Sequence, residues 1–137
     1  MYLTKKYIEE LTYHINGACI EVHRTLGPGL IESVYHRCLA HEFNERGIEF
    51  ISEMSIPIEY KGINLHADFR CDFLVENTIV VELKAVEVMH PVFQAKLLTY
   101  MRLAEKPKGI LINFNVVNLM GEGYKTFVND LFRLLPD

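Results

Sequence analysis

Two alternating segments joined by a short turn constrain the fold of this chain more than any other feature. Polar and apolar side chains alternate along residues 66–75 and again along Ile79–Lys84, as they do along β-strands. Residues 76–78, Glu-Asn-Thr, lie between the two segments and favour a turn. The sequence therefore predicts two neighbouring antiparallel strands, in which a loop over residues 76–78 pairs Val75 with Ile79.

This register decides which side chains share a face of the strand pair. It sets Asp72 directly across from Glu82 and Arg70 across from Lys84, with the odd-numbered apolar side chains on the opposite face. Opposed carboxylates destabilise a sheet unless a cation compensates their charge. The pattern thus predicts a polar face on which Asp72 and Glu82 bind a divalent cation such as Mg²⁺. Lys84 on the same face can orient a water or stabilise charge developing on a phosphate.

The same pattern has a simpler interpretation, in which a surface strand pair carries solvated charges and has no catalytic role. A bare D…ExK pattern is short, so it occurs by chance. The histidines add no metal site from the sequence alone. His23 fits a packed, hydrogen-bonded side chain, and His90 precedes Pro91 and fits a helix entry. The others form no metal-ligand spacing with the cysteines and receive no role: His14, His36, His41 and His66.

The rest of the chain divides into helices and strands by periodicity and by Gly and Pro punctuation. Glu32 falls in the first turn of the second predicted helix, where a carboxylate can simply complement the positive end of the helix dipole. Tyr35 is expected to be a supporting aromatic at the edge of the core. The predicted elements are a helix over about residues 4–26 with Thr4 as N-cap, a helix over 30–47, strand-like residues 50–60, a turn at Lys61-Gly62, a helix entered at Pro91, and a strand over 109–114.

Length and composition limit the number of domains and the setting of the protein. A chain of 137 residues that is 50% hydrophobic has material for one core, so we expect a single domain over residues 1–137. No apolar stretch approaches the length of a membrane-spanning helix, and the N-terminus lacks a signal-peptide pattern, so we expect a soluble cytosolic protein. Cys19, Cys38 and Cys71 fit reduced core thiols. A net charge of -4 neither supports nor excludes binding to nucleic acid.

Several ordered motifs resemble a known family. The segment Gly29-Leu30-Ile31-Glu32-Ser33-Val34-Tyr35 resembles the signature of the GxxExxY proteins, which belong to the PD-(D/E)XK nuclease superfamily. Further similar blocks are residues 22–29, 69–75, 80–85, 97–100 and 109–114. The resemblance implies an α/β fold with a mixed sheet, built on the restriction-endonuclease-like αβββαβ core with an extra N-terminal helix. It places Glu32 on the leading helix, Asp72 and Glu82 on adjacent strands as metal ligands, and Lys84 at the end of the motif.

The function that the resemblance implies is hydrolysis of phosphodiester bonds in DNA or RNA, with Mg²⁺ or Mn²⁺ as cofactor and Glu32, Asp72, Glu82 and Lys84 as the catalytic residues. Related nucleases carry a Gln-x-x-x-Tyr motif on the helix after the ExK strand. Here the corresponding residues are Lys96 and Tyr100, which we predict to contact substrate together with Arg70.

Two alternatives to catalysis stay open. One is a catalytically inactive module that keeps the nuclease fold and binds nucleic acid or a protein partner, because one fold hosts many functions. The other is a homo-oligomer partnered through an exposed sheet edge or through residues 121–137, whose apolar side chains could equally cover the core.

Overall fold

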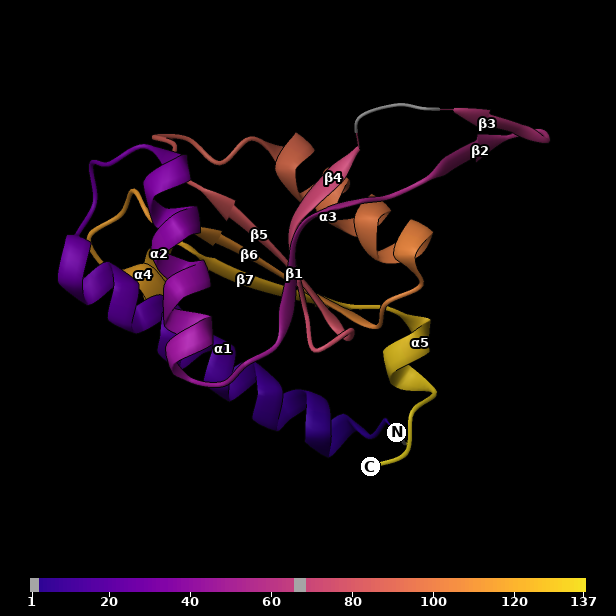
Figure 1. Ribbon diagram of the computed structural model, residues 1–137, viewed down its shortest axis with the longest axis horizontal. Helices are drawn as coiled ribbons and strands as arrows, with labels where there is room; N and C mark the ends of the chain where they lie inside the picture. The colour runs from indigo at the N-terminus through magenta and orange to yellow at the C-terminus, as the bar shows by residue number, and fades with distance from the viewer. Residues whose placement is uncertain (1–2, 66–68) are drawn as a thin grey trace.

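Helices flank a mixed β-sheet in the computed structural model, which describes residues 3–65 and 69–137 (Figure 1). The helices and strands, in chain order, are α1 (Lys5–Leu26), α2 (Glu32–Glu45), β1 (Phe50–Ser55), β2 (Ile58–Tyr60), β3 (Ile63–Leu65), β4 (Arg70–Val75), β5 (Ile79–Lys84), α3 (Pro91–Ala104), β6 (Lys108–Asn113), α4 (Leu119–Glu122), β7 (Tyr124–Val128) and α5 (Asp130–Arg133). None of the described helices combines the length and apolar character that crossing a lipid bilayer demands.

The main sheet has the strand order β1-β4-β5-β6-β7, in which only the β5–β6 pair is parallel. Along the chain, α2, β1, β4, β5, α3 and β6 follow in the order αβββαβ, with α1 in front of them. The predicted α/β architecture with a mixed sheet is therefore confirmed. Strands β2 and β3 form a separate hairpin that projects from the body of the molecule (Figure 1).

Helices α1 and α2 cover one face of the sheet. Thr4 caps α1 as predicted, since its side chain accepts a hydrogen bond from the N–H of Tyr7 at 3.0 Å. Apolar side chains at helical spacing then face the sheet. The core on this face includes Ile8, Leu11, Ile15, Cys19, Val22, Tyr35, Leu39, Phe43, Phe73, Val75, Val81, Leu83 and Ile112.

Helix α3 covers the opposite face. It places Leu97, Tyr100 and Met101 in a second core with residues from three strands. Gly109 of β6 allows the close approach, because a Cβ atom there would lie 2.6 Å from the sulfur of Met101. The strand residues of this core are Cys71, Leu74, Val80 and Leu111.

The prediction of an open polar face on the β4–β5 pair is wrong, because both faces of the sheet are covered by helices. Even-numbered Leu74 and Val80 are buried in the α3 core. The odd-numbered apolar residues do not share a face either: Phe73 belongs to the α1–α2 core and Cys71 to the α3 core. The side-chain alternation of β4 therefore shifts at Asp72. The predicted start of this strand, residues 66–68, lies outside the described residues.

The shift at Asp72 is matched on the neighbouring strand. In the β1–β4 register, Ser52 pairs with Phe73 and Met54 with Cys71, which sets Glu53 opposite Asp72. Glu53 has a φ of 53°, in the left-handed region that side chains other than glycine rarely adopt. Both strands thus change faces at the same level of the sheet.

Several predicted boundaries are confirmed and others are corrected. Val75 pairs with Ile79 as predicted, and Lys61 and Gly62 form the β2–β3 turn with positive φ angles. The second helix begins at Glu32, two residues later than predicted, so Ile31 is 70% exposed and does not belong to its apolar face. The predicted strand over 50–60 is interrupted at residues 56–57, consistent with the missing N–H of proline.

The predicted pairing of Arg70 with Lys84 is wrong. The β4–β5 ladder ends at Phe73 and Val81, while Arg70 pairs with Ser55 of β1 and Lys84 lies in register with Asn113 of β6. The pairing of β4 with β5 therefore stops before Arg70 and Lys84.

The C-terminal segment mainly covers the core. Strand β7 pairs with β6, and Phe127 packs against the α3 core. Phe132 and Leu135 pack against the α1–α2 core, whereas Leu134 is exposed. Self-association through this segment therefore stays a prediction.

Tyr35 fixes the loop that precedes α2. Its hydroxyl accepts a hydrogen bond from the N–H of Leu30 at 3.2 Å and donates one to the carbonyl of Gly27 at 2.5 Å. Its ring stacks on Phe114, with the centroids 4.7 Å apart. Because Glu32 is the first residue of α2, these contacts determine where its side chain enters the molecule.

The substitution Tyr35→Phe tests this account of the loop. It keeps the ring and removes both hydrogen bonds, so we expect the free energy of unfolding, measured by urea denaturation, to fall by about 1–2 kcal/mol. Tyr13→Phe is the matched control, because the side chain of Tyr13 is exposed, and it should leave stability unchanged. Equal effects of the two substitutions would contradict the role given to the Tyr35 hydroxyl.

Candidate active site

Beyond the end of the β4–β5 ladder, the side chains of Asp72 and Glu82 accept hydrogen bonds from backbone N–H groups. The last paired residues are Phe73 and Val81, so the same register sets Asp72 opposite Glu82, as predicted. The N–H of Asp72 donates to Oε1 of Glu82 at 2.6 Å, and the N–H of Leu83 donates to Oδ2 of Asp72 at 2.8 Å. Each carboxyl group is thereby held by the backbone of the facing strand.

Burial governs the ionisation of this pair. Glu82 is 7% exposed, and burial together with the nearby charge of Asp72 raises the pKa of Glu82 to about 8. Burial also raises the pKa of Asp72, while the hydrogen bond from the N–H of Leu83 lowers it. The pair therefore holds protons more tightly than isolated carboxyl groups do, and a cation beside it would displace them.

Glu32 approaches the pair from the start of α2. It is half-buried, and burial raises its pKa. The charge of Lys84 lowers the pKa of Glu32 and the charge of Asp72 raises it, so both groups are close enough to act on it. The helix predicted to carry Glu32 thus brings it to the same region as the two strands.

Lys84 supplies positive charge at the end of β5. Its Nζ atom lies 4.4 Å from the centroid of the Phe93 ring on α3. Its charge lowers the pKa values of Glu32, Asp72 and Glu82. One ammonium group therefore acts on all three carboxyl groups.

His36 also belongs to this region, although no role was predicted for it from the sequence. Its Nδ1 lies 3.9 Å from Oδ1 of Asp72, and its Nε2 is hydrogen-bonded to Oγ of Ser52 at 2.7 Å. Its ring stacks on Phe73 with the centroids 4.3 Å apart. The available signal was its spacing, because His36 lies one helical turn after Glu32 and shares its helix face.

The three predicted substrate contacts lie in different settings. Lys96 is exposed on α3, and its charge lowers the pKa values of Glu32 and Glu82. Tyr100 is 3% exposed, and its pKa is raised by burial and then by the charges of Glu82 and Asp72. Tyr100 therefore lies in the α3 core, close enough to the two carboxyl groups for their charges to act on it. Arg70 is exposed at the start of β4. Contact of these residues with a substrate stays a prediction.

A family model described as the PD-(D/E)XK nuclease superfamily matches residues 9–127. The chain belongs to this superfamily. Comparisons with curated proteins and with solved structures gave no match. The observed αβββαβ order agrees with a PD-(D/E)XK nuclease-like fold. Membership indicates nuclease activity on nucleic acid, and PD-(D/E)XK nucleases generally use divalent metal ions.

The donor set of this candidate site suits a hard divalent cation. Asp72 and Glu82 offer two adjacent carboxyl groups, and Mg²⁺ commonly takes one or two carboxylates while it keeps several waters. Across residues 3–65 and 69–137, no three His, Cys, Asp or Glu side chains are arranged to hold a metal ion on their own. The residues therefore fit an ion held by Asp72 and Glu82 with water as further ligand, and Glu32 is the nearby carboxyl group that water can bridge.

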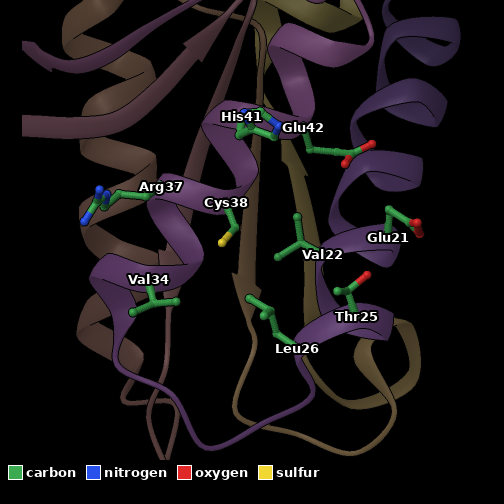
Figure 2. Close-up of a pocket in the computed structure, with 9 residues that line it drawn as sticks. All are labelled: Glu21, Val22, Thr25, Leu26, Val34, Arg37, Cys38, His41 and Glu42. Atoms are coloured by element: carbon green, nitrogen blue, oxygen red, sulfur yellow. The ribbon is translucent and has the colours of Figure 1, made fainter.

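A separate hollow of about 500 Å³ lies between α1 and α2 of the PD-(D/E)XK domain (Figure 2). Val22 and Leu26 of α1 and Val34 and Cys38 of α2 are among the apolar side chains that line it (Figure 2). None of the four predicted catalytic residues lines this hollow. The candidate active site is therefore the region around Asp72 and Glu82.

The raised pKa of Glu82 predicts how the stability of the metal-free protein depends on pH. A carboxyl group whose pKa rises on folding contributes stability that is present below its unfolded pKa and is lost as the pH rises through its folded pKa. The free energy of unfolding should therefore fall between about pH 4.5 and about pH 8. Glu82→Gln should flatten this fall and stabilise the protein at pH 8.

Urea denaturation in the presence of a chelator, repeated across this pH range, measures the effect. Glu59→Gln removes an exposed carboxyl group on β2 and is the matched control. Parallel pH profiles for the wild type and Glu82→Gln would show that Glu82 is not the buried acid described here.

Proposed function

We propose that this chain is a metal-dependent nuclease that hydrolyses phosphodiester bonds in DNA or RNA. Asp72, Glu82 and Glu32 hold Mg²⁺ or Mn²⁺, directly or through water, and Lys84 acts on the reacting groups. The observation that carries the proposal is the Asp72–Glu82 pair, whose carboxyl groups are fixed by the facing backbone at 2.6 and 2.8 Å and have raised pKa values. Keeping two buried acids together lowers stability, and a cation offsets that cost.

The chain's own groups have distinct tasks in this proposal. A bound divalent ion supplies an activated water and polarises a phosphate oxygen. Lys84 donates hydrogen bonds to the attacking water or to the phosphate, where negative charge grows in the transition state. Lys96, exposed on α3, and Arg70, exposed at the start of β4, contact the phosphate backbone of the substrate.

Finer assignments belong to the same proposal. We assign the chain to the GxxExxY type, because Gly29, Glu32 and Tyr35 stand at the signature positions and Tyr35 fixes the loop before Glu32. We also propose that residues 1–137 form one domain. A cytoplasmic setting accords with Cys19, Cys38 and Cys71, all of which are free thiols.

Two observations favour a second candidate, a nuclease-fold module that binds nucleic acid without cleaving it. In the described part of the chain, no group of three potential ligands is arranged to hold a metal ion. Lys96 also stands where related nucleases have glutamine, and a lysine there favours phosphate binding. The cleavage experiment decides between the two candidates.

The test is a cleavage assay on single- and double-stranded DNA and RNA, with Mg²⁺, with Mn²⁺ and with a chelator. We expect cleavage that requires the metal ion. Lys84→Ala should lower kcat at least about a hundredfold, as removal of one transition-state hydrogen-bond donor does, with a smaller effect on nucleic-acid affinity. Lys106→Ala is the matched control. Lys106 is hydrogen-bonded to Asn77, near the end of β5 that lies away from Lys84, so its loss removes a positive charge outside the site.

Purified wild type that binds nucleic acid but cleaves none of these substrates would overturn the nuclease proposal in favour of the binding module. Cleavage by Lys84→Ala at the wild-type rate would remove Lys84 from the mechanism. Equal losses of kcat in Lys84→Ala and Lys106→Ala would mean that the rate depends on the net charge of the protein and not on Lys84 in the site.

A further inference from the structure

The ammonium group of Lys84 is in contact with an aromatic ring. Its Nζ lies 4.4 Å from the centroid of Phe93, within the roughly 6 Å over which a cation is attracted to the face of a ring. None of the ion pairs among the described residues involves Lys84. The charge is nevertheless felt by Glu32, Asp72 and Glu82.

The difference between a ring and a carboxylate matters for a lysine that must act on a substrate. A carboxylate in an ion pair occupies the N–H donors of the ammonium group and competes with a phosphate for them. A ring face attracts the charge from one side and accepts no strong hydrogen bond. Phe93 can therefore restrain Lys84 while leaving its donors available.

The Phe93 ring is itself held in place. It is half-buried and packs against the α3 core, with the His90 ring edge-on to it at a centroid distance of 6.4 Å. The chain that leads from Lys84 to α3 is tied to the end of β6. There, Asn113 accepts a hydrogen bond from the N–H of Val86 at 3.1 Å and donates one to its carbonyl at 2.9 Å. The packing of the ring against the α3 core therefore restricts its position beside Lys84.

We propose that Phe93 is a positioning residue of the active site, which holds the ammonium group of Lys84 over its ring face and keeps it out of ion pairs with the three carboxyl groups. This inference rests on the proposed nuclease function and adds a residue to it. No sequence spacing links Phe93 to Lys84, because they meet only through the packing of α3 on β5. Without the ring, Lys84 turns toward the carboxyl groups, and the reacting phosphate loses a donor.

The contact can be tested first without activity or metal. The Cε protons of Lys84 over a ring face should resonate upfield of those of the other lysines in NMR spectra of the metal-free protein. The upfield shift should vanish in Phe93→Leu and persist in Phe93→Tyr. A Lys84 resonance at the ordinary position in the wild type would overturn the proposal.

The second test measures cleavage while the shape of the ring is kept. Site-specific replacement of Phe93 by phenylalanines with one, two and three ring fluorines weakens the attraction for a cation step by step, with little change in packing. We expect kcat to fall with each step, to about a tenth of the wild-type value in Phe93→Leu, with KM nearly unchanged. Double-stranded DNA and single-stranded RNA with Mn²⁺ are the probes.

Two controls separate positioning from structure. Fluorination of Phe132, which lies near Lys5 at 5.9 Å and outside the site, should leave kcat unchanged. Fluorination of Phe93 in the Lys84→Ala variant should add no further loss, because the two changes act through one contact. The positioning role would be overturned if kcat did not change on fluorination of Phe93, or if fluorination lowered kcat equally in the Lys84→Ala variant. The nuclease proposal would stand in either case. Absence of any wild-type cleavage would overturn the nuclease proposal itself, and the NMR result would still report on the contact.

Discussion

The exchange of hydrogen bonds between Asp72 and Glu82 supports the rest of the site. Each carboxyl group accepts an N–H of the facing strand, at 2.6 and 2.8 Å, where ladder bonds would otherwise join β4 to β5. The strands can separate there without leaving those N–H groups unpaired. Asp72 is also the residue at which β4 shifts its side chains between the two cores, opposite Glu53 and its positive φ. One position thus serves both the sheet and the site.

The charges around this exchange are arranged at a cost to stability. Burial raises the pKa values of Glu32, Asp72 and Glu82, and the charge of Asp72 further raises the pKa values of Glu32 and Glu82. The charge of Lys84 lowers the pKa values of all three carboxyl groups. In our proposal, the contact with the Phe93 ring holds the Lys84 ammonium group beside them. In the proposed function, a bound divalent cation would offset this cost, which is the arrangement expected of a metal-dependent site.

Local features of the sequence predicted much of the fold and of the candidate site. Residues 76–78 and the alternation beside them gave the β4–β5 register, and with it the opposition of Asp72 and Glu82, because a hairpin loop sets its own register. The shift at Asp72 could not be predicted, since it depends on the backbone of Glu53 in another strand. The places of His36 and Phe93 likewise follow from how helices pack on the sheet, which no local pattern encodes.

The central claim is that Asp72, Glu82 and Glu32 bind a divalent cation, and the most direct measurement is the melting temperature with and without Mg²⁺ or Mn²⁺. Ligand at about a hundred times its Kd stabilises the native state by about 2.7 kcal/mol, so the wild type should melt several degrees higher with metal. The triple variant Glu32→Gln, Asp72→Asn, Glu82→Gln should lose this response and be no less stable than the wild type without metal. A metal response as large in the triple variant as in the wild type would contradict the account.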